Sequence, residues 1–119
     1  MDFSAKEIIL SIPEYFDPQK AGNRTLCVVY HIHDSGAGDG VWTVTVQGGA
    51  CIVCEGEPEV YDTKVYLTEA IYKRIVQGRL DIQKLAYTSG AIRYYGNTLG
   101  HSELNSYCKL PWLKGIIAI

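Results

Sequence analysis

Two pairs of residues in this sequence have spacings that could bind a metal ion. Cys51 and Cys54 are separated by two residues, which is the spacing of redox and zinc motifs. On a strand, residues three apart point to opposite faces, so these side chains are better interpreted as two separate thiols, buried or half-buried. His31 and His33 would share one strand face, but no third ligand accompanies them. We therefore predict no metal site and an exposed histidine pair.

Three further polar segments resemble catalytic or binding motifs only in part. The loop 35–40 has glycines at dinucleotide-like spacing, but a strand follows it instead of the helix that would meet a phosphate. The glutamates of segment 55–59 alternate with glycine and proline and indicate a solvated acidic loop. His101, Ser102 and Glu103 do not form a nucleophile elbow. We therefore predict no catalytic residues, no cofactor and no enzymatic activity.

The composition is typical of a single globular domain spanning residues 1–119. A chain of 119 residues with 47% hydrophobic and 20% charged residues can bury a substantial core. The formal charge of −2, without a cluster of lysines and arginines, argues against a nucleic-acid partner. There is no signal-peptide pattern and no apolar stretch of membrane-spanning length. We expect a cytoplasmic protein whose four cysteines are free thiols.

The elements that would position these residues are mainly strands. Alternating apolar and polar residues, separated by turn-forming glycines, are typical of half-buried strands. The expected strands are 25–34, a hairpin of 40–46 and 50–54 joined by Gly48-Gly49, then 62–67 and 91–95. One apolar and one more polar face indicate a sheet that is covered on one side.

The alternation also predicts which side chains face the core. Thr43 and Thr45 should point outward, with Tyr66 and Tyr95. The expected inward set is Leu26, Val28, Tyr30, Ile32, Trp42, Val44, Val46, Ile52, Cys54, Thr63, Val65, Leu67, Ile92 and Tyr94.

Helical periodicity predicts helices before, between and after the strands. Residues 3–15 form an apolar stripe, although Pro13 could end or restart that helix. A helix over 68–77 begins at a capping threonine and stops at Gly78, and a short second helix follows Asp81. The last helix, 98–108, would have Leu99, Leu104, Tyr107 and Cys108 as its apolar side.

Segment 110–119 is unusual because it is mostly apolar at a chain end. The gain from burying its large side chains and the entropic cost of ordering ten residues are similar in size. We therefore expect this tail to dock conditionally, as a lid over a groove, a ligand or a partner.

The order and spacing of several short segments resemble the sterol carrier protein type two family, the non-specific lipid-transfer domains. The likeness covers roughly residues 16–108. The segments that carry it are Gly40-Val41-Trp42-Thr43-Val44, Gly48-Gly49, Glu55-Gly56-Glu57-Pro58-Glu59, 62–68, Gly78-Arg79-Leu80-Asp81, Ser89-Gly90-Ala91-Ile92 and Gly96-Asn97. After Gly96-Asn97 this chain is more polar than many relatives, and it does not end in a peroxisomal targeting tripeptide.

The resemblance implies an α+β fold with a five-stranded mixed, mostly antiparallel sheet. Its order would be a helix, a three-strand meander, a crossover strand, helices, a strand and a C-terminal helix. The resemblance also implies helices on one face that enclose an apolar cavity for fatty acyl chains, sterols or similar lipids, without catalytic residues.

Our first hypothesis is therefore a lipid carrier that contacts membranes or lipid enzymes transiently. The expected lipid-binding walls are Tyr30, Ile32, Trp42, Val44, Ile71, Ile75, Leu80, Leu85, Tyr94, Leu104 and Tyr107, with Trp112 and Ile116 in the lid. Three tyrosines, at 30, 94 and 107, could either pack in the core or orient a lipid head group.

Two alternatives from other classes stay open. The chain could be an interaction adaptor or a homodimer with a packed core, in which the apolar tail forms the interface. It could also be an enzyme that presents a lipid-linked substrate, which would require a titratable cluster in the cavity. An inward His101 or Glu103 with a strongly shifted pKa would support that alternative.

Overall fold

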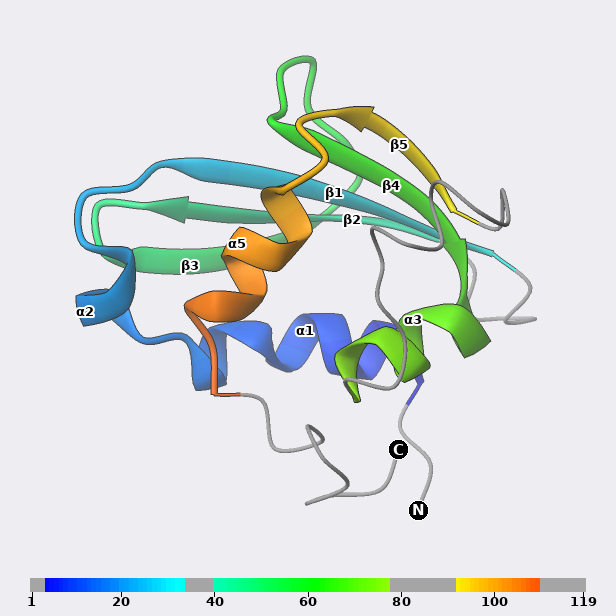
Figure 1. The fold of residues 1–119 in the computed structure, drawn as a ribbon, viewed down its shortest axis with the longest axis horizontal. Helices are drawn as coiled ribbons and strands as arrows, with labels where there is room; N and C mark the ends of the chain where they lie inside the picture. Colours follow the sequence, from blue (N-terminus) through cyan, green and yellow to red (C-terminus); the bar gives the residue numbers. More distant parts are fainter. Residues whose placement is uncertain (1–3, 34–39, 78–91, 110–119) are drawn as a thin grey trace.

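A five-stranded sheet with helices beneath one face makes up the fold of this computed structural model (Figure 1). The structure describes residues 4–33, 40–77 and 92–109. The elements are α1 (Ala5–Tyr15), α2 (Pro18–Ala21), β1 (Leu26–His33), β2 (Gly40–Gln47), β3 (Ala50–Glu55), β4 (Thr63–Thr68), α3 (Glu69–Val76), β5 (Arg93–Gly96) and α5 (Gly100–Ser106). The predicted α+β class and its mixed sheet are confirmed.

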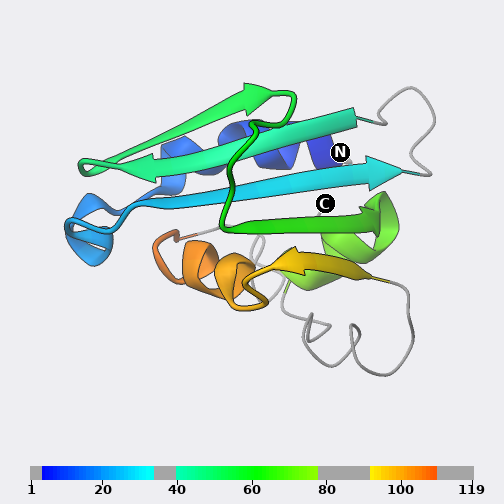
Figure 2. The same ribbon diagram turned by 90° about the horizontal axis from the view of Figure 1, so that it is seen from above.

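The sheet order is β3-β2-β1-β4-β5. β1 and β4 pair in parallel, and the other neighbours pair antiparallel. A parallel pair requires a crossover, and here the connection from β3 to β4 crosses the face opposite the helices (Figure 2). We call residues 56–62 the strap. Its ends are fixed by hydrogen bonds from Gly56 N to Val41 O (2.8 Å) and from Asp62 N to Cys27 O (3.0 Å).

The core lies between the inner face of the sheet and α1, α3 and α5. The expected inward residues of β1, β2 and β4 are all buried, which confirms the predicted alternation of these strands. β5 follows the same pattern: Ile92, just before it, is buried, and Tyr94 packs against the core.

The predicted inward face of β3 is wrong. Ile52 is 58% exposed and Cys54 is exposed, whereas Cys51 and Val53 pack against the core. The two-residue turn at Gly48-Gly49, with φ of 60° and 77°, pairs Gln47 with Ala50. Val46 therefore lies opposite Cys51, and every side chain of β3 has the parity opposite to the expected one.

The outer face of the sheet is also more covered than expected. Thr43 points outward but is only 6% exposed, because the strap lies over it. Its hydroxyl donates a hydrogen bond of 2.6 Å to Gly56 O. The strap thus buries Thr43 on an otherwise more polar and open face.

α1 begins with a capping box and continues past its internal proline. Ser4 Oγ accepts from Glu7 N, and Glu7 Oε1 accepts from Ser4 N. Pro13 lies in the last turn of α1, so the helix runs on to Tyr15 instead of ending there. Glu69, at the start of α3, accepts a hydrogen bond of 2.8 Å from Ala5 N and joins the two helices.

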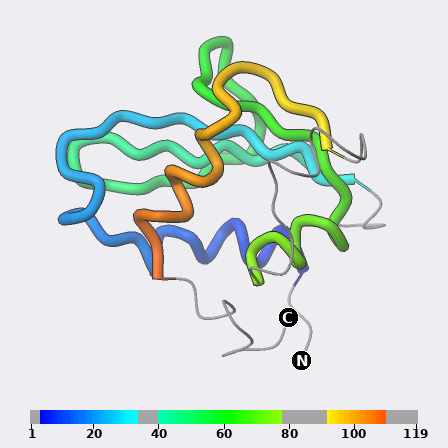
Figure 3. The backbone as a smooth tube through the Cα atoms, viewed as in Figure 1, coloured from blue at the N-terminus to red at the C-terminus, as the bar shows by residue number. Residues whose placement is uncertain are grey.

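α5 is shorter than the helix predicted for 98–108, and Leu99 is 56% exposed instead of lying on its apolar side. Its end lies beside the end of α1 (Figure 3), where Asp17 N donates to Tyr107 O (2.7 Å) and Lys109 N donates to Tyr15 O (2.9 Å). The predicted helix stop at position 78, the short helix after position 81 and the tail 110–119 lie outside the described residues.

Candidate functional site

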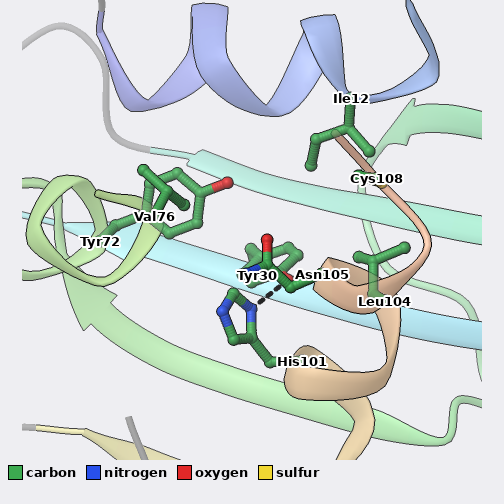
Figure 4. A pocket seen from close by; sticks show the side chains of 8 residues that line it. All are labelled: Ile12, Tyr30, Tyr72, Val76, His101, Leu104, Asn105 and Cys108. Atoms are coloured by element: carbon green, nitrogen blue, oxygen red, sulfur yellow. Dashed lines mark hydrogen bonds between the residues drawn. The ribbon is translucent and has the colours of Figure 1, made fainter. Parts of the chain in front are cut away.

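A small enclosed pocket lies between the sheet and the helices (Figure 4). Its volume is about 10 Å³, which is the space of about one water molecule. α1, β1, α3 and α5 contribute its walls together with the residues that follow α5. The lining residues are Ile12, Tyr30, Tyr72, Val76, His101, Leu104, Asn105 and Cys108.

At the centre of the pocket, Tyr30 and His101 form a buried hydrogen-bonded pair. The Tyr30 hydroxyl lies 2.6 Å from His101 Nδ1 (Figure 4). The two side chains are only 1% and 5% exposed. Their rings meet edge to face with centroids 5.7 Å apart, and Tyr72 contacts the other side of Tyr30 in a similar geometry at 5.5 Å.

Burial fixes the protonation of this pair. Removal from water disfavours the charged imidazolium and lowers the pKa of His101 to about 4, so this histidine is neutral at pH 7. Burial likewise raises the pKa of Tyr30 well above its usual value, so the phenol keeps its proton. The hydrogen bond between the Tyr30 hydroxyl and Nδ1 therefore joins two neutral groups, and which of them donates depends on the tautomer of His101.

Gly100 sets the position of His101 at the start of α5. A methyl group on Gly100 would overlap the hydroxyl of Thr63, so only glycine allows the helix to begin this close to β4. The Thr63 hydroxyl is itself fixed by a 2.6 Å hydrogen bond to Asn97 O. This contact brings the next residue, His101, beneath the sheet and toward Tyr30.

The described residues that line the pocket include no activated nucleophile and no metal ligand set. Burial raises the pKa of the Cys108 thiol to about 12, so it remains a neutral thiol at pH 7. No group of three or more histidine, cysteine, aspartate or glutamate side chains that could hold a metal ion occurs in residues 4–33, 40–77 and 92–109.

The predicted wall residues are distributed around the core rather than gathered at this pocket. Two of them, Tyr30 and Leu104, line it. Tyr30, Ile32, Trp42, Val44, Ile75 and Leu104 are buried, while Ile71, Tyr94 and Tyr107 are partly buried against the core. Leu80, Leu85, Trp112 and Ile116 lie outside the described residues.

The expected lipid-binding walls did not include His101, Tyr72 or Asn105, and an inward His101 was considered only for the enzymatic alternative. A signal for His101 is present, because His101, Leu104 and Cys108 recur at the spacing of one helix face. Glu103 instead points to the surface. Its carboxylate accepts hydrogen bonds from the Arg24 guanidinium and from the Tyr107 hydroxyl (2.6 Å). Both bonds lower the pKa of Glu103, and the bond from Arg24 has the larger effect.

On the outer face, the strap is held by a polar and aromatic cluster. Glu57 accepts from Lys64 Nζ (2.8 Å) and lies 2.9 Å from His31 Nε2. The His31 ring stacks on Tyr66 with centroids 4.1 Å apart, and His31 is half-buried. The prediction that His31 and His33 are both exposed is therefore wrong for His31. An open groove of about 530 Å³ lies between the strap and the outer face of β1, β2 and β3, with Cys27 and Cys54 among its lining residues.

The chain has the sterol carrier protein 2-like fold, as comparison with solved structures shows. The palmitated SCP2L2 of Aedes aegypti, seen in a solution structure, has a TM-score of 0.61 at 19% identity; the match covers 87% of this chain and 93% of that one. Apo sterol carrier protein 2 of Yarrowia lipolytica has a TM-score of 0.57 at 16% identity, covering 87% and 96%. No family model and no curated protein matches the sequence.

The same fold occurs within larger proteins. The stereoselective inverting sec-alkylsulfatase Pisa1 from a Pseudomonas species has a TM-score of 0.72 at 17% identity. The match covers 82% of this chain but only 15% of the sulfatase chain. The likeness is therefore one of fold. In the described part of this chain, no helix is long and apolar enough to cross a membrane.

Proposed function

We propose that this protein is a lipid carrier that holds a fatty acyl, isoprenoid or sterol-like ligand between the sheet and the helices. The observation that carries the proposal is the sterol carrier protein 2-like fold, shared with a neighbour whose structure was solved in palmitated form. The inner face agrees with this role, because nearly all of its large side chains are apolar and buried. Such a carrier would work in the cytoplasm and would contact membranes or lipid enzymes transiently.

The driving force for binding would be burial of the ligand's apolar surface, at about 25 cal/mol per Å². The enclosed pocket of about 10 Å³ is far smaller than an acyl chain. Binding at this pocket therefore requires α3 or α5 to move outward from the sheet. Ligand uptake should accordingly be slower than diffusion and should be coupled to helix displacement.

The pocket does not favour the enzymatic alternative. His101 does point inward with a strongly lowered pKa, but it lies beside neutral tyrosine and cysteine side chains and no activated nucleophile. Glu103 faces outward in an ion pair. The adaptor or homodimer alternative depends on the tail 110–119, and the test below also addresses it.

The test is native mass spectrometry of the full chain purified from its own cell extract, followed by solvent extraction of bound molecules. We expect a stoichiometric lipid, and the purified apo protein should take up a fluorescent fatty acid. A clean apo mass with no uptake, together with a mass that increases with concentration, would contradict the carrier and favour the adaptor.

A matched pair of variants locates the binding site. Val76 lines the pocket and is 1% exposed, whereas Val60 lies on the strap and is 83% exposed. Val76→Phe should fill the pocket and reduce lipid uptake at least severalfold, and Val60→Phe should not. Circular dichroism and thermal unfolding of both variants establish that each is folded before uptake is compared.

A further inference from the structure

β3 is the terminal strand at one margin of the sheet (Figure 2). The hydrogen bond from Gly56 N to Val41 O fixes which of its backbone groups face β2. Because hydrogen-bonded pairs alternate in an antiparallel ladder, the backbone N–H and C=O of Ile52 point toward β2, and those of Cys51 and Val53 point away from it. No described residue hydrogen-bonds to these outward groups. β3 therefore presents free donors and acceptors that another strand can pair with.

β3 lacks the features that usually protect an edge strand from such pairing. The strand Ala50–Glu55 contains no lysine, arginine or proline, and Glu55 at its end is its only charged residue. By contrast, β5 at the opposite margin is only four residues long and begins with the exposed Arg93. In the middle of β3, Ile52 is 58% exposed. An apolar edge with one terminal charge is typical of a strand that pairs with another chain.

A second copy of the chain fits this edge in one antiparallel register. A two-fold axis perpendicular to the sheet places inner face beside inner face, so residues opposite each other must share the same parity. Two such registers overlap most of the strand, with the axis at Ile52 or at Val53. An axis at Val53 would place the Glu55 carboxylate opposite Cys51, which packs against the core.

An axis at Ile52 avoids this conflict. It places the most exposed apolar side chain of β3 against its own counterpart, and it leaves Glu55 opposite Gly49 in the turn of the second copy. The two Glu55 residues are then six positions apart along the paired strands, which is about 20 Å. This separation exceeds the Debye length of about 8–10 Å at physiological salt, so the two like charges hardly repel each other.

We infer that two copies of this chain associate by pairing β3 with β3 across a two-fold axis at Ile52, which joins their sheets into one continuous sheet. In this register Cys51 exchanges backbone hydrogen bonds with Val53 of the second copy. The interface is small, so the dimer is weak and its population depends on protein concentration. No β3 residue lines the pocket between the sheet and the helices, so this inference does not depend on the proposed carrier function.

Sedimentation velocity of the full-length protein tests the dimer. We expect the mass to rise from that of a monomer toward that of a dimer between about 1 µM and about 1 mM protein. Ile52→Lys places two like charges opposite each other at the axis and should weaken the dimer at least about tenfold. Val60→Lys is the matched control, because it adds the same charge at an 83% exposed position of the strap, and it should keep the dimer. Circular dichroism and thermal unfolding establish that both variants are folded.

Disulfide cross-linking tests the register. The two copies of residue 52 form a non-hydrogen-bonded pair, whose Cα atoms are about 4.5 Å apart and so within the range that a disulfide spans. In a Cys54→Ser background, which removes an exposed thiol, Ile52→Cys should form a covalent dimer in oxidised glutathione. Val60→Cys in the same background has a more exposed position but should cross-link at least severalfold more slowly.

The outcomes distinguish this dimer from other arrangements. A monomer at every concentration would overturn the inference, and so would equal dimerisation of wild type and Ile52→Lys. Equal cross-linking rates of the two cysteine variants would overturn the axis at Ile52. Loss of the dimer in Trp112→Asp but not in Ile52→Lys would assign the interface to the tail 110–119 instead. The carrier is judged separately, by lipid uptake, which Ile52→Lys should leave unchanged.

Discussion

His101 should make the stability of this protein fall steeply in mild acid. Its pKa is about 4 in the folded protein and 6.5 in the unfolded chain, because burial disfavours the charged ring. Between these values the unfolded state binds one more proton, so acid shifts the equilibrium toward unfolding. The stabilisation is complete above about pH 6.5 and is lost progressively as the pH falls toward 4. At about pH 4.5 the loss relative to pH 7 is roughly 2 kcal/mol.

Urea unfolding at several pH values measures this effect. A loss of roughly 2 kcal/mol corresponds to a midpoint lower by about 1 M urea. His101→Gln should remove most of this pH dependence, whereas His31→Gln should keep it. The difference between wild type and variant cancels the contribution of the carboxylates that both share. Equal acid sensitivity in wild type and His101→Gln would refute our conclusion that this histidine is buried in its neutral form.

Three further predictions concern packing, thiol reactivity and the strap. Gly100→Ala should lower the free energy of unfolding by about 2 kcal/mol, because the new methyl group overlaps Thr63. Chemical denaturation measures this free energy, and an unchanged midpoint would contradict the close contact. Cys54 is exposed, whereas Cys108 is buried and has a pKa of about 12, so Cys54 should react with a thiol reagent much faster than Cys108. Mass spectrometry of modified peptides gives the order of reaction of the two thiols, and the reverse order would be inconsistent with the structure. Glu57→Gln should lower Tm slightly in dilute buffer and hardly at all in about 1 M salt, because it weakens surface ion pairs; a loss independent of salt would argue against them.

The alternation of apolar residues was enough to predict most of the sheet. Leu26, Val28 and Val44 are buried as expected, because a side-chain period of two leaves only one way to place an apolar face on the core. The same reasoning failed for β3, where Ile52 is more hydrophobic than Cys51 but lies outside. Hydrophobicity alone could not decide the parity of this short strand, whereas the length of the turn at Gly48-Gly49 does.

The covered outer face could not be deduced from local pattern. Thr43 is a polar residue at an outward position of its strand, where exposure is expected. Its burial depends on a strap that crosses two strands. Glu57 contacts Lys64, 7 positions away in the sequence, and His31, 26 positions away, and no strand or helix period connects these positions.

The sequence by itself determined the fold class, the strand faces of β1, β2 and β4, and the α3 cap at Thr68, because each depends on neighbours within a few residues. Tertiary structure alone decided the site. Tyr30 and His101 are separated by 71 residues, and they meet only because Gly100 allows α5 to start against β4. A histidine on a helix is ordinarily solvated, and only the loss of water around it gives this one a depressed pKa.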